Sequence, residues 1–462
     1  MSMPDKMEQI VSLCKRRGFI YPSGDIYGGL RGFWDYGPLG ARLKKNIRDL
    51  WWRDMVTASP VHPESRQPLT IVPFEGSIIT NPDVWHASGH ASTFVDTFLT
   101  CPECHKDSKH ELWSVKGEVF GIACPLCGEK IEDSPKATGD LLSTGRTFDL
   151  MFKSEAGVVQ GDTTKVFLRP ETAQSIFVNF NNILQTNRLK IPFGISQIGK
   201  AFRNEVTPRH FTFRSREFEQ MEMEWFYNPE MDISTTEWMN FWVETRYHWW
   251  NSLGLNHLKQ YKQSKDELAH YAKDGAGTVD ILYEFPWGYE EIEGIAHRTD
   301  YDLRRHSEAS GVDMQYFDQE SEKKFFPHII EPSAGLDRAV LAVLCEAYTY
   351  DESRPCKELM RIEPRIAPIK LAFFPLVNKG GMPEIAISLF NHYRRKYDCV
   401  YDAKQSVGKR YARMDEIGTP FCITVDGETL TNDTVTVRCR DSMEQQRIDL
   451  ESLEIFFSSQ LG

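Results

Sequence analysis

The sequence lacks any apolar run long enough to cross a membrane, which takes about 20 consecutive apolar residues in a helix. Its first ten residues, MSMPDKMEQI, lack the apolar core of a secretory signal peptide. The ten cysteines among 462 residues are too sparse for a secreted disulfide framework. These absences predict a protein of the reducing cytoplasm without a membrane partner.

An excess of positive charge is also missing, because 54 Lys and Arg residues face 66 Asp and Glu residues, a net charge of −12. This balance argues against nonspecific nucleic-acid binding over the whole surface, although local basic patches can still bind. The sequence has no repeats and no low-complexity tracts. A composition of 41% hydrophobic and 26% charged residues is ordinary for a globular protein, and the length predicts two or more domains.

Four cysteines form two matched pairs, CPEC with Cys101 and Cys104, and CPLCGE with Cys124 and Cys127. Each pair places two thiolates on one tight turn, and two such turns can close a tetrahedral site, for which zinc is the usual metal in a reducing compartment. Unligated buried cysteines are the alternative, but they do not explain the paired spacing. Four protein ligands leave no open position for water, so we expect a structural zinc site.

The order of predicted elements indicates how the chain is organised. A first helix ends at Gly18, and a second, ARLKKNIRDLWWRDMV, carries an apolar stripe that suits either the core or a dimer contact. Residues 97–150 are expected to be an insertion that carries the cysteine pairs. Strand signals dominate residues 165–230, and a Trp-rich helix follows over 233–253. The proline-containing segment RPCKELMRIEPRIAPIK is predicted to link this region to an alternating αβ unit.

The stretch FRNEVTPRHFTFRSREFEQMEMEWF, from Phe202 to Phe226, is predicted to form two strands joined by an arginine-rich loop. Side chains alternate along a strand, which places Arg203 and Glu205 on one face of the first strand. The second strand has an apolar face of Met221, Met223 and Trp225, and a face of Phe218, Gln220, Glu222 and Glu224. Unpaired buried charges cost several kcal/mol, so the second face suits a site for a nucleotide and a cationic amine.

Two further segments offer matching groups. LRPETAQ places Arg169 and Glu171 on a short extended segment, and EPSAGLDRAVLAVLCEAY places Glu331 and Ser333 at a strand end before a helix. Arg338 lies in the first turn of that helix, where free N–H groups already favour an anion. Taken singly, Glu331 also fits a solvated strand end and Arg338 a surface charge.

Together these segments resemble a known family. FRNE with its loop and REFEQMEME resembles motif 2 of the class II aminoacyl-tRNA synthetases, and AGLDR before an apolar helix resembles motif 3. The ordered combination of YPSGDIYGG, DYGPLG, RPETAQ, EFEQMEME, EIEGIAHRTDYDL and EPSAGLDR is similar to the homodimeric (α2) glycyl-tRNA synthetases. Motif 1 corresponds loosely to the helix around Leu43–Val56 and the strand after it.

The resemblance implies an α+β fold in which an antiparallel sheet is flanked by helices. It implies a class II catalytic domain over residues 1–362, with the zinc-ribbon-like insertion at 97–150, and an αβ anticodon-binding domain over 366–462. The implied enzyme is a cytoplasmic homodimer. It activates glycine with ATP and Mg²⁺ to glycyl-adenylate and pyrophosphate, then transfers glycine to the 3′ end of tRNA(Gly).

The resemblance also implies the site residues. Arg203, Glu205 and Arg338 are the implied catalytic residues, Phe218 stacks on adenine, Arg298 and Arg338 hold phosphates, and Glu291 contributes to the magnesium site. The implied ATP site consists of Arg203, Asn204, Glu205, Phe213, Arg214, Ser215, Arg216, Glu217, Phe218, Glu291, Ile292, Gly335, Leu336, Asp337 and Arg338. The implied glycine site consists of Lys109, Glu171, Phe218, Glu219, Gln220, Met221, Glu222, Arg298, Glu331, Pro332, Ser333, Ala334 and Gly335.

Glycine has no side chain to grip, so its ammonium group must carry recognition, and carboxylates are natural acceptors for it. An extra methyl group has to be forced into a filled pocket, so no editing domain is required. Relatives carry a substrate-binding arginine in the insertion, and Lys109 in HKDSKHELW is the candidate for that position here.

The C-terminal region carries its basic residues in HYRRKY and KQSVGKRYARM, interleaved with tyrosines. They suit phosphate contacts and base stacking on single-stranded RNA, or simply a solvated helix face. The predicted tRNA contacts are Arg394, Arg395, Lys409 and Arg410.

Two other functional classes are possible. A class II synthetase for threonine, proline or histidine would share the fold, but the ring of Glu171, Glu222 and Glu331 argues against it. A non-catalytic, synthetase-like RNA-binding or regulatory protein would be free to lose Arg203, Glu205 or Arg338, yet all three are present.

Overall fold

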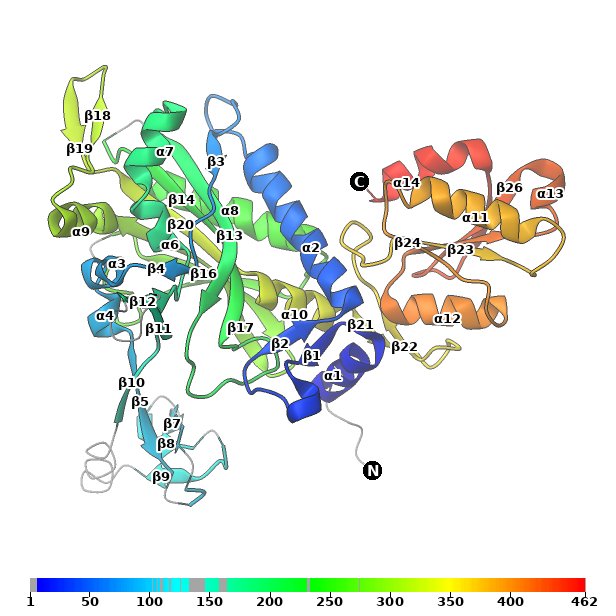
Figure 1. Ribbon diagram of the computed structural model, residues 1–462, viewed down its shortest axis with the longest axis horizontal. Coiled ribbons are helices and arrows are strands. Elements are labelled where there is room, and N and C mark those ends of the chain that lie inside the picture. Colours follow the sequence, from blue (N-terminus) through cyan, green and yellow to red (C-terminus); the bar gives the residue numbers. More distant parts are fainter. Residues whose placement is uncertain are drawn as a thin grey trace.

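A computed structural model describes the chain in two bodies, a larger one in blue to yellow and a smaller C-terminal one in orange and red (Figure 1). The described residues are 6–101, 103–105, 107–108, 111–115, 118–124, 126–132, 146–157, 164–230, 233–273 and 275–461. Lys109 lies outside them, so its predicted substrate contact lies outside the described residues as well. Among the described residues, no helix combines the length and the apolar character needed to cross a membrane.

A seven-stranded sheet forms the centre of the larger body, and nearly all of its neighbouring strands are antiparallel. Only the edge strand β3 pairs in parallel, with β13. The strand order is β15 (Leu258–Lys262), β16 (Thr278–Phe285), β17 (Gly288–Thr299), β20 (His328–Gly335), β14 (Glu217–Tyr227), β13 (Phe193–Phe202) and β3 (Ile71–Pro73). This arrangement confirms the predicted antiparallel sheet flanked by helices.

One face of the sheet carries the main hydrophobic core. Met221, Met223 and Trp225 of β14 are fully buried there, as their alternation along the strand predicts. The helices on this face are α1 (Lys6–Arg17), α2 (Pro38–Trp52), α8 (Thr235–Ser252) and α10 (Leu336–Ala347). The stripe on α2 is core, since Leu43 and Ile47 are fully buried.

The opposite face is covered only in part. A second core packs Phe177 and Phe180 against Phe193 and Phe226 of the sheet. The helices here are α6 (Ala173–Phe177), α7 (Phe180–Asn187) and α9 (Tyr301–Ser310). The rest of this face remains open, and it is the face of Phe218, Gln220 and Glu222.

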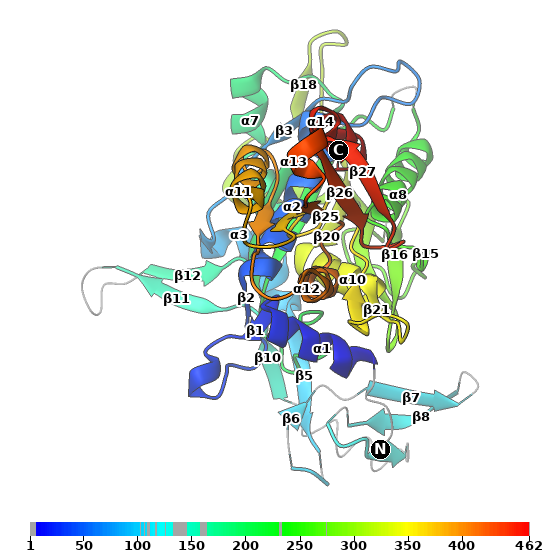
Figure 2. The same cartoon turned by 90° about the vertical axis from the view of Figure 1, so that its right-hand side faces the viewer.

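The insertion leaves and rejoins the larger body through one antiparallel pair, β5 (Val95–Thr100) with β10 (Arg146–Asp149). Its other strands are β6 (Asp107–Ser108), β7 (Glu111–Val115), β8 (Glu118–Ala123) and β9 (Lys130–Glu132). Figure 2 shows β7 and β8 at the bottom of the molecule, away from the central sheet, and the β11–β12 hairpin projecting to one side. The insertion is therefore joined to the core by a narrow stem.

Short elements connect the longer ones in the larger body. They are β1 (Ile20–Pro22), η1 (Asp25–Tyr27), β2 (Trp34–Tyr36), η2 (Arg53–Thr57), β4 (Ile79–Thr80), α3 (Pro82–Ala87), α4 (His90–Thr93), β11 (Lys153–Ala156), β12 (Thr164–Leu168), β18 (Tyr316–Asp318), β19 (Lys323–Phe325), β21 (Tyr348–Tyr350) and β22 (Glu358–Met360).

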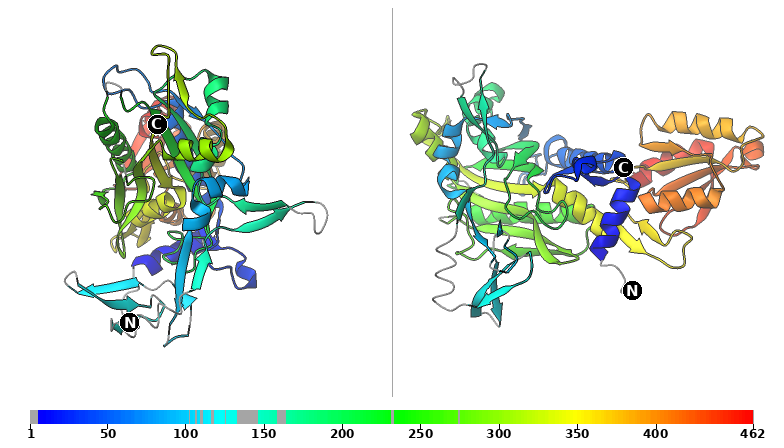
Figure 3. Two further views of the ribbon diagram at one scale, coloured as in Figure 1. Left: turned by 90° about the vertical axis from the view of Figure 1, so that its left-hand side faces the viewer. Right: turned by 60° about the horizontal axis from the view of Figure 1, so that its bottom comes forward.

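The smaller body is a five-stranded sheet between helices, with its own core (Figure 3). The strand order is β24 (Cys399–Tyr401), β23 (Leu371–Pro375), β25 (Phe421–Val425), β26 (Thr434–Cys439) and β27 (Gln445–Asp449). The helices are α11 (Met382–Tyr393), α12 (Val407–Ile417), α13 (Thr429–Asn432), η3 (Leu450–Ser452) and α14 (Leu453–Leu461). The predicted alternation of strands and helices is confirmed.

The segment between the two bodies is packed rather than loose. Ile362 and Ile366 are fully buried in the main core, and the Asn46 side chain of α2 donates to the Ile366 and Ala367 carbonyls at 3.2 and 3.0 Å. Its prolines predicted a linker, and the structure adds that apolar side chains between them anchor this linker to the larger body.

Candidate active site

A polar cavity of about 470 Å³ opens on the uncovered face of the central sheet. Its walls come from the β13–β14 loop, from β14, β16, β17 and β20, and from the start of α10. The lining residues are Glu171, Arg203, Glu205, Arg209, Thr212, Phe213, Arg214, Ser215, Phe218, Glu219, Gln220, Glu222, Gln263, Tyr271, Thr278, Asp280, Glu290, Glu291, Gly294, Ala296, Glu331, Ser333, Ala334, Gly335, Asp337 and Arg338. Segments far apart in the sequence thus meet in one site.

The β13–β14 loop is folded around Glu205. Arg214 donates to the Glu205 carboxylate from Nε at 2.8 Å, and the Arg216 Nε donates to the Glu205 carbonyl at 3.0 Å. The predicted first strand extends too far, because β13 ends at Phe202 and Arg203 lies in the loop. Both arginines are therefore held by Glu205. Arg214 lines the cavity, whereas Arg216 does not and donates from Nη1 to the Arg31 carbonyl at 3.3 Å.

Two arginines lie against aromatic rings on either side of the cavity. The Arg203 guanidinium carbon is 5.3 Å from the centre of the Phe218 ring, and its Nε donates to the Pro170 carbonyl at 3.0 Å. The Arg338 guanidinium carbon is 4.3 Å from the centre of the Phe213 ring. The ring contacts orient two permanent positive charges beside the cavity. Arg338 also lies 3.6 Å from the Glu291 carboxylate and donates to the Glu291 carbonyl at 2.7 Å.

Acidic side chains gather at the inner end of the cavity. The Glu222 carboxylate accepts hydrogen bonds from Thr172 Oγ1, from Ser333 Oγ at 2.7 Å and from Gln220 Nε2 at 3.4 Å. One carboxyl oxygen each of Glu222, Glu224 and Glu331 lies within 4.8 Å of the other two, so three acids crowd one place at this end. Such a cluster is stable only when positive charges or protons balance it.

Arg298 supplies one of those balancing charges. Its guanidinium is buried, donates to the Asp302 carboxylate from Nε at 2.7 Å and from Nη2 at 2.9 Å, and donates to Glu331 from Nη1. The ring of Tyr271 covers it, with its centre 3.8 Å from the guanidinium carbon. The structure therefore places Arg298 behind the carboxylates, with its donors satisfied by Asp302 and Glu331.

The acidic groups of the cavity are electrostatically unequal. Burial by itself would raise the pKa of Glu171, but His90, Arg298 and Arg203 hold it below its usual value, and His90 Nε2 lies 3.2 Å from the carboxylate. Burial and Glu291 raise the pKa of Asp280 to about 6. The inner end thus carries one firmly ionised carboxylate, and the outer end one that titrates near neutrality.

Comparison with known proteins decides the family. Residues 152–348 match the tRNA synthetase class II core domain (G, H, P, S and T), and residues 370–460 match the anticodon binding domain. The chain is 44% identical to the glycine–tRNA ligase of Thermobifida fusca, over 99% of this chain and 98% of that protein. It is 45% identical to the enzyme of Treponema denticola, over 96% and 94% respectively.

The chain belongs to the glycine–tRNA ligase family. The glycine–tRNA ligase of Rhodopirellula baltica is a further relative, 42% identical over 97% of this chain and 98% of its own length. The sequence resemblance to the class II synthetases is confirmed, including the class II core and the anticodon-binding region.

Most of the residues predicted for this family line the cavity, but several face elsewhere. The side chains of Met221, Ile292 and Leu336 are fully buried in the main core, so only their backbone groups can reach a ligand. Pro332 alternates with Glu331 and Ser333 on β20 and therefore points to the opposite side of the sheet.

Two predicted acidic residues are held by a lysine of α2. Lys44 Nζ lies 2.8 Å from Asp337 and 3.2 Å from Glu219, and the Asp337 carboxylate also accepts from Tyr36 at 2.5 Å. Glu217 is paired with Lys200 at 2.8 Å. These groups tie the class II motifs to the core. The Asn204 backbone N–H donates to the Leu150 carbonyl at 2.8 Å.

Sequence reasoning missed several residues of the site. His90, Thr172 and Tyr271 contact or line the inner end, and Asp280 lines the outer wall, but each is a single residue outside the motifs. Only TVDILYEF gave a signal, because strand alternation puts the polar Asp280 among apolar residues. His90 comes from α4, distant in sequence from its partner Glu171.

The cysteine pairs come together as their spacing predicts. Cys101 Sγ lies 3.6 Å from Cys127 Sγ, and Cys104 Sγ lies 3.8 Å from Cys124 Sγ. All four sulfurs lie within 4.8 Å of one another. Tetrahedral Zn–S bonds of about 2.3 Å put the sulfurs about 3.8 Å apart, so the four residues fit a zinc ion.

The predicted tRNA residues divide into two groups. Arg394, Arg395 and Lys409 are exposed, around the end of α11 and the start of α12. Arg410 is only 2% exposed, and its Nη1 donates to the Pro375 and Asp402 carbonyls at 2.6 and 3.2 Å. Arg410 therefore holds the smaller body together, because its guanidinium is turned inward.

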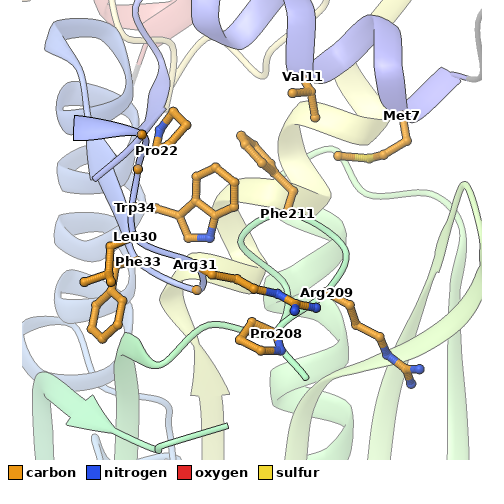
Figure 4. A pocket seen from close by; sticks show the side chains of 13 residues that line it. Met7, Val11, Pro22, Leu30, Arg31, Phe33, Trp34, Pro208, Arg209 and Phe211 are labelled. Atoms are coloured by element: carbon orange, nitrogen blue, oxygen red, sulfur yellow. The ribbon is translucent and has the colours of Figure 1, made fainter. Parts of the chain in front are cut away.

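A second cavity, of about 490 Å³, lies beside the β13–β14 loop (Figure 4). Trp34 and Phe211 meet edge to face within it, with ring centres 4.6 Å apart. Met7 and Val11 reach it from α1, as the close-up shows. The N-terminal helix thus lies over the loop that carries the arginines predicted to bind ATP.

Proposed function

We propose that the protein is an active glycine–tRNA ligase. The glycine carboxylate attacks the α-phosphorus of ATP and pyrophosphate leaves, which gives glycyl-adenylate. The terminal hydroxyl of tRNA(Gly) then attacks the carbonyl carbon and AMP leaves. One observation carries the proposal: a polar cavity has partly buried guanidinium groups at its outer part and hydrogen-bonded carboxylates at its inner end.

The outer part of the cavity is the proposed ATP site. Arg203 binds the α-phosphate, and its contact with Phe218 supports this role because it fixes the guanidinium beside the ring proposed to stack on adenine. Arg214 and Arg338 bind the remaining phosphates. No general base is required, since the attacking carboxylate is already ionised, and catalysis consists of positioning and charge neutralisation.

The inner end is the proposed glycine site. The glycine ammonium lies among Glu171, Glu222 and Glu331, with Gln220 and Ser333 orienting the Glu222 carboxylate. Burial of these groups supports strong charge-assisted hydrogen bonds. The same crowding leaves little space at the α-carbon, so a methyl group there would have to displace packed side chains.

Magnesium fits the outer wall of the cavity. Asp280, Glu290 and Glu291 all line it, and oxygen ligands of this kind are what Mg²⁺ prefers. The Gly294 position lies between two of these carboxylates, since a Cβ there would be 3.6 Å from the Asp280 oxygen and 3.9 Å from that of Glu291. A bound Mg²⁺ would neutralise phosphate charge.

The proposal also includes a zinc ion, a tRNA-binding surface and a homodimeric assembly. Cys101, Cys104, Cys124 and Cys127 hold a structural zinc, supported by their sulfur spacing. Exposed Arg394, Arg395 and Lys409 contact tRNA(Gly) phosphates. The active form is a cytoplasmic homodimer, and analytical ultracentrifugation tests the dimer.

Glycine-dependent ATP–pyrophosphate exchange tests the activity. We expect exchange with glycine and at least about 100-fold less with alanine, serine, threonine, proline or histidine, because each adds atoms to a filled pocket. Exchange with threonine, proline or histidine would assign another class II specificity. The absence of exchange with every amino acid, in protein that binds tRNA, would favour the non-catalytic alternative.

A further inference from the structure

Glu224 is a fully buried acid beside the cavity, and the activity described above does not use it. It lies on β14 two residues beyond Glu222, on the same face, and its side chain is fully buried. Neither of its carboxyl oxygens has a hydrogen-bond partner among the described residues. By contrast, three donors reach Glu222, and Arg298 donates to Glu331.

The register of the sheet places Glu224 opposite another acid. Glu222 pairs with Ser333 and Trp225 pairs with Ile330, so Glu224 faces Glu331 across the β14–β20 ladder. Directly opposite side chains in a sheet have Cβ atoms about 5 Å apart, and like charges at this separation are destabilising. The two carboxyl groups therefore meet with no intervening side chain of opposite charge on either strand.

Charged groups surround Glu224 from four different elements. Glu222 lies on its own strand, Glu331 on β20, Arg298 on β17 and Asp302 on α9. The guanidinium of Arg298 is already shared by Asp302 and Glu331. A fourth negative charge here would have no counter-charge and no donor, which costs several kcal/mol in a buried position.

We propose that Glu224 is a protonated carboxylic acid that donates a hydrogen bond to Glu331 and so positions it for the glycine ammonium. The proton removes the repulsion between the two acids and supplies Glu331 with a second donor beside Arg298. The remaining lone pairs of Glu331 then face the cavity. Burial, followed by the charges of Glu331 and Glu222, raises the pKa of Glu224 well above its usual value, which agrees with this state.

The role of Glu224 in glycine binding rests on the proposed function, whereas its protonated state does not. Glu224 is a positioning residue, because it acts through Glu331 and is itself sealed from the cavity. Its proton also explains how three acids can converge at one place, because Glu224 contributes a neutral donor and not a further negative charge.

Infrared spectroscopy of the full-length protein without substrate tests the proton directly. We expect a carbonyl stretch of a protonated carboxylic acid at pH 7.5 that disappears in Glu224→Gln, in a wild-type minus variant difference spectrum. The absence of this band from the difference spectrum would overturn the proposal, whatever the activity of the protein.

Kinetics of glycine-dependent exchange test the positioning role. Glu224→Gln retains a donor toward Glu331 and should keep the glycine KM within about threefold. Glu224→Leu has similar volume but no donor, and losing a hydrogen bond to a charged group should raise the glycine KM about 10- to 100-fold. The KM for ATP should stay within about twofold in both variants. Equal glycine KM values for the Leu variant and the wild type would contradict the role.

Discussion

Arg203 is the residue at which the two ends of the cavity meet. Its guanidinium lies over Phe218 on the outer side, and its charge helps keep Glu171 ionised on the inner side. We predict that Arg203→Ala reduces glycine-dependent pyrophosphate exchange by about 10²–10³-fold or more, because no other donor replaces it at the developing charge.

The control for Arg203 is Arg304→Ala, which removes a half-exposed arginine of α9 that pairs with Asp300 away from the cavity. This variant should exchange pyrophosphate at the wild-type rate. Exchange within a few-fold of the wild type in folded Arg203→Ala protein would contradict the motif 2 assignment.

His297 gives the larger body a dependence on pH. The Ala276 N–H donates to His297 Nδ1 at 2.8 Å, so that nitrogen carries no proton and the ring is neutral. Burial and the neighbouring His328 lower the pKa of His297 to about 4. The unfolded chain, with a pKa of about 6.5, binds more protons at this position between about pH 6.5 and pH 4, so the free energy of unfolding falls as the pH falls.

We predict that His297→Asn weakens this loss of stability on going from pH 7 to pH 5, by about 2 kcal/mol. Urea unfolding followed by tryptophan fluorescence measures it, because all 11 tryptophans precede the C-terminal region. His248→Gln, at an exposed position on α8, is the control and should keep the wild-type pH dependence. An unchanged dependence in His297→Asn would contradict the assignment.

Residue identity and strand alternation were enough to predict the lining of β14 and β20, since period two puts Glu222, Glu331 and Ser333 on one face. They could not predict His90 or Tyr271. These reach the site from elsewhere in the chain, and their contacts arise from tertiary packing that no local pattern encodes. The same reason explains Arg410, where a basic segment looks exposed in sequence but one guanidinium turns inward to backbone carbonyls.

At the scale of elements, the insertion depends on its cysteines more than on a core. It joins the larger body through the β5–β10 pair alone among its described strands, and Cys101 and Cys124 are its buried cysteines. We predict that Cys104→Ser removes one equivalent of zinc and loosens the insertion, because metal binding is coupled to folding in such sites.

Elemental analysis and limited proteolysis measure this outcome. The insertion should become sensitive to protease while the central sheet stays folded, and a chelator should reproduce the effect in wild-type protein. Cys439→Ser, in the smaller body and without a matched partner in the sequence, should keep its zinc. Reduced wild-type protein with no stoichiometric metal would contradict the zinc assignment.

Element ends were the least predictable part of the fold. The pattern Arg203-x-Glu205 continues the alternation of β13, yet the strand ends at Phe202, because the loop instead satisfies its backbone around Glu205. The packed linker is a similar case. Its prolines are visible in the sequence, but the burial of Ile362 and Ile366 depends on α2 and the main core.

At the scale of the whole molecule, the proposed function assigns tRNA binding to the smaller body and glycine activation to the larger one. We predict that replacing Arg394, Arg395 and Lys409 by Gln weakens tRNA binding, and that each lost phosphate contact lowers the salt slope by somewhat less than one unit. Glycine-dependent exchange needs no tRNA and should stay near the wild-type rate, since these residues lie in the smaller body.

Filter binding at several salt concentrations and pyrophosphate exchange on the same variant check both statements. Lys379→Gln, an exposed lysine outside the two basic segments, is the matched control and should leave both activities unchanged. If exchange falls in step with tRNA binding, the smaller body supports the catalytic fold, and its proposed role in reading the anticodon loses its basis.

Helix α1 contacts both the β13–β14 loop of the larger body and the smaller body. Near its start, Met7 and Val11 line the cavity beside the β13–β14 loop. At its end, Arg16 Nη2 pairs with Glu416 of α12 at 2.8 Å, and Arg17 pairs with the same carboxylate. A helix of twelve residues, about 18 Å long, therefore runs from α12 of the smaller body to the cavity beside the β13–β14 loop. The smaller body and the β13–β14 loop therefore share one rigid helix, so a displacement of either would bear on the other.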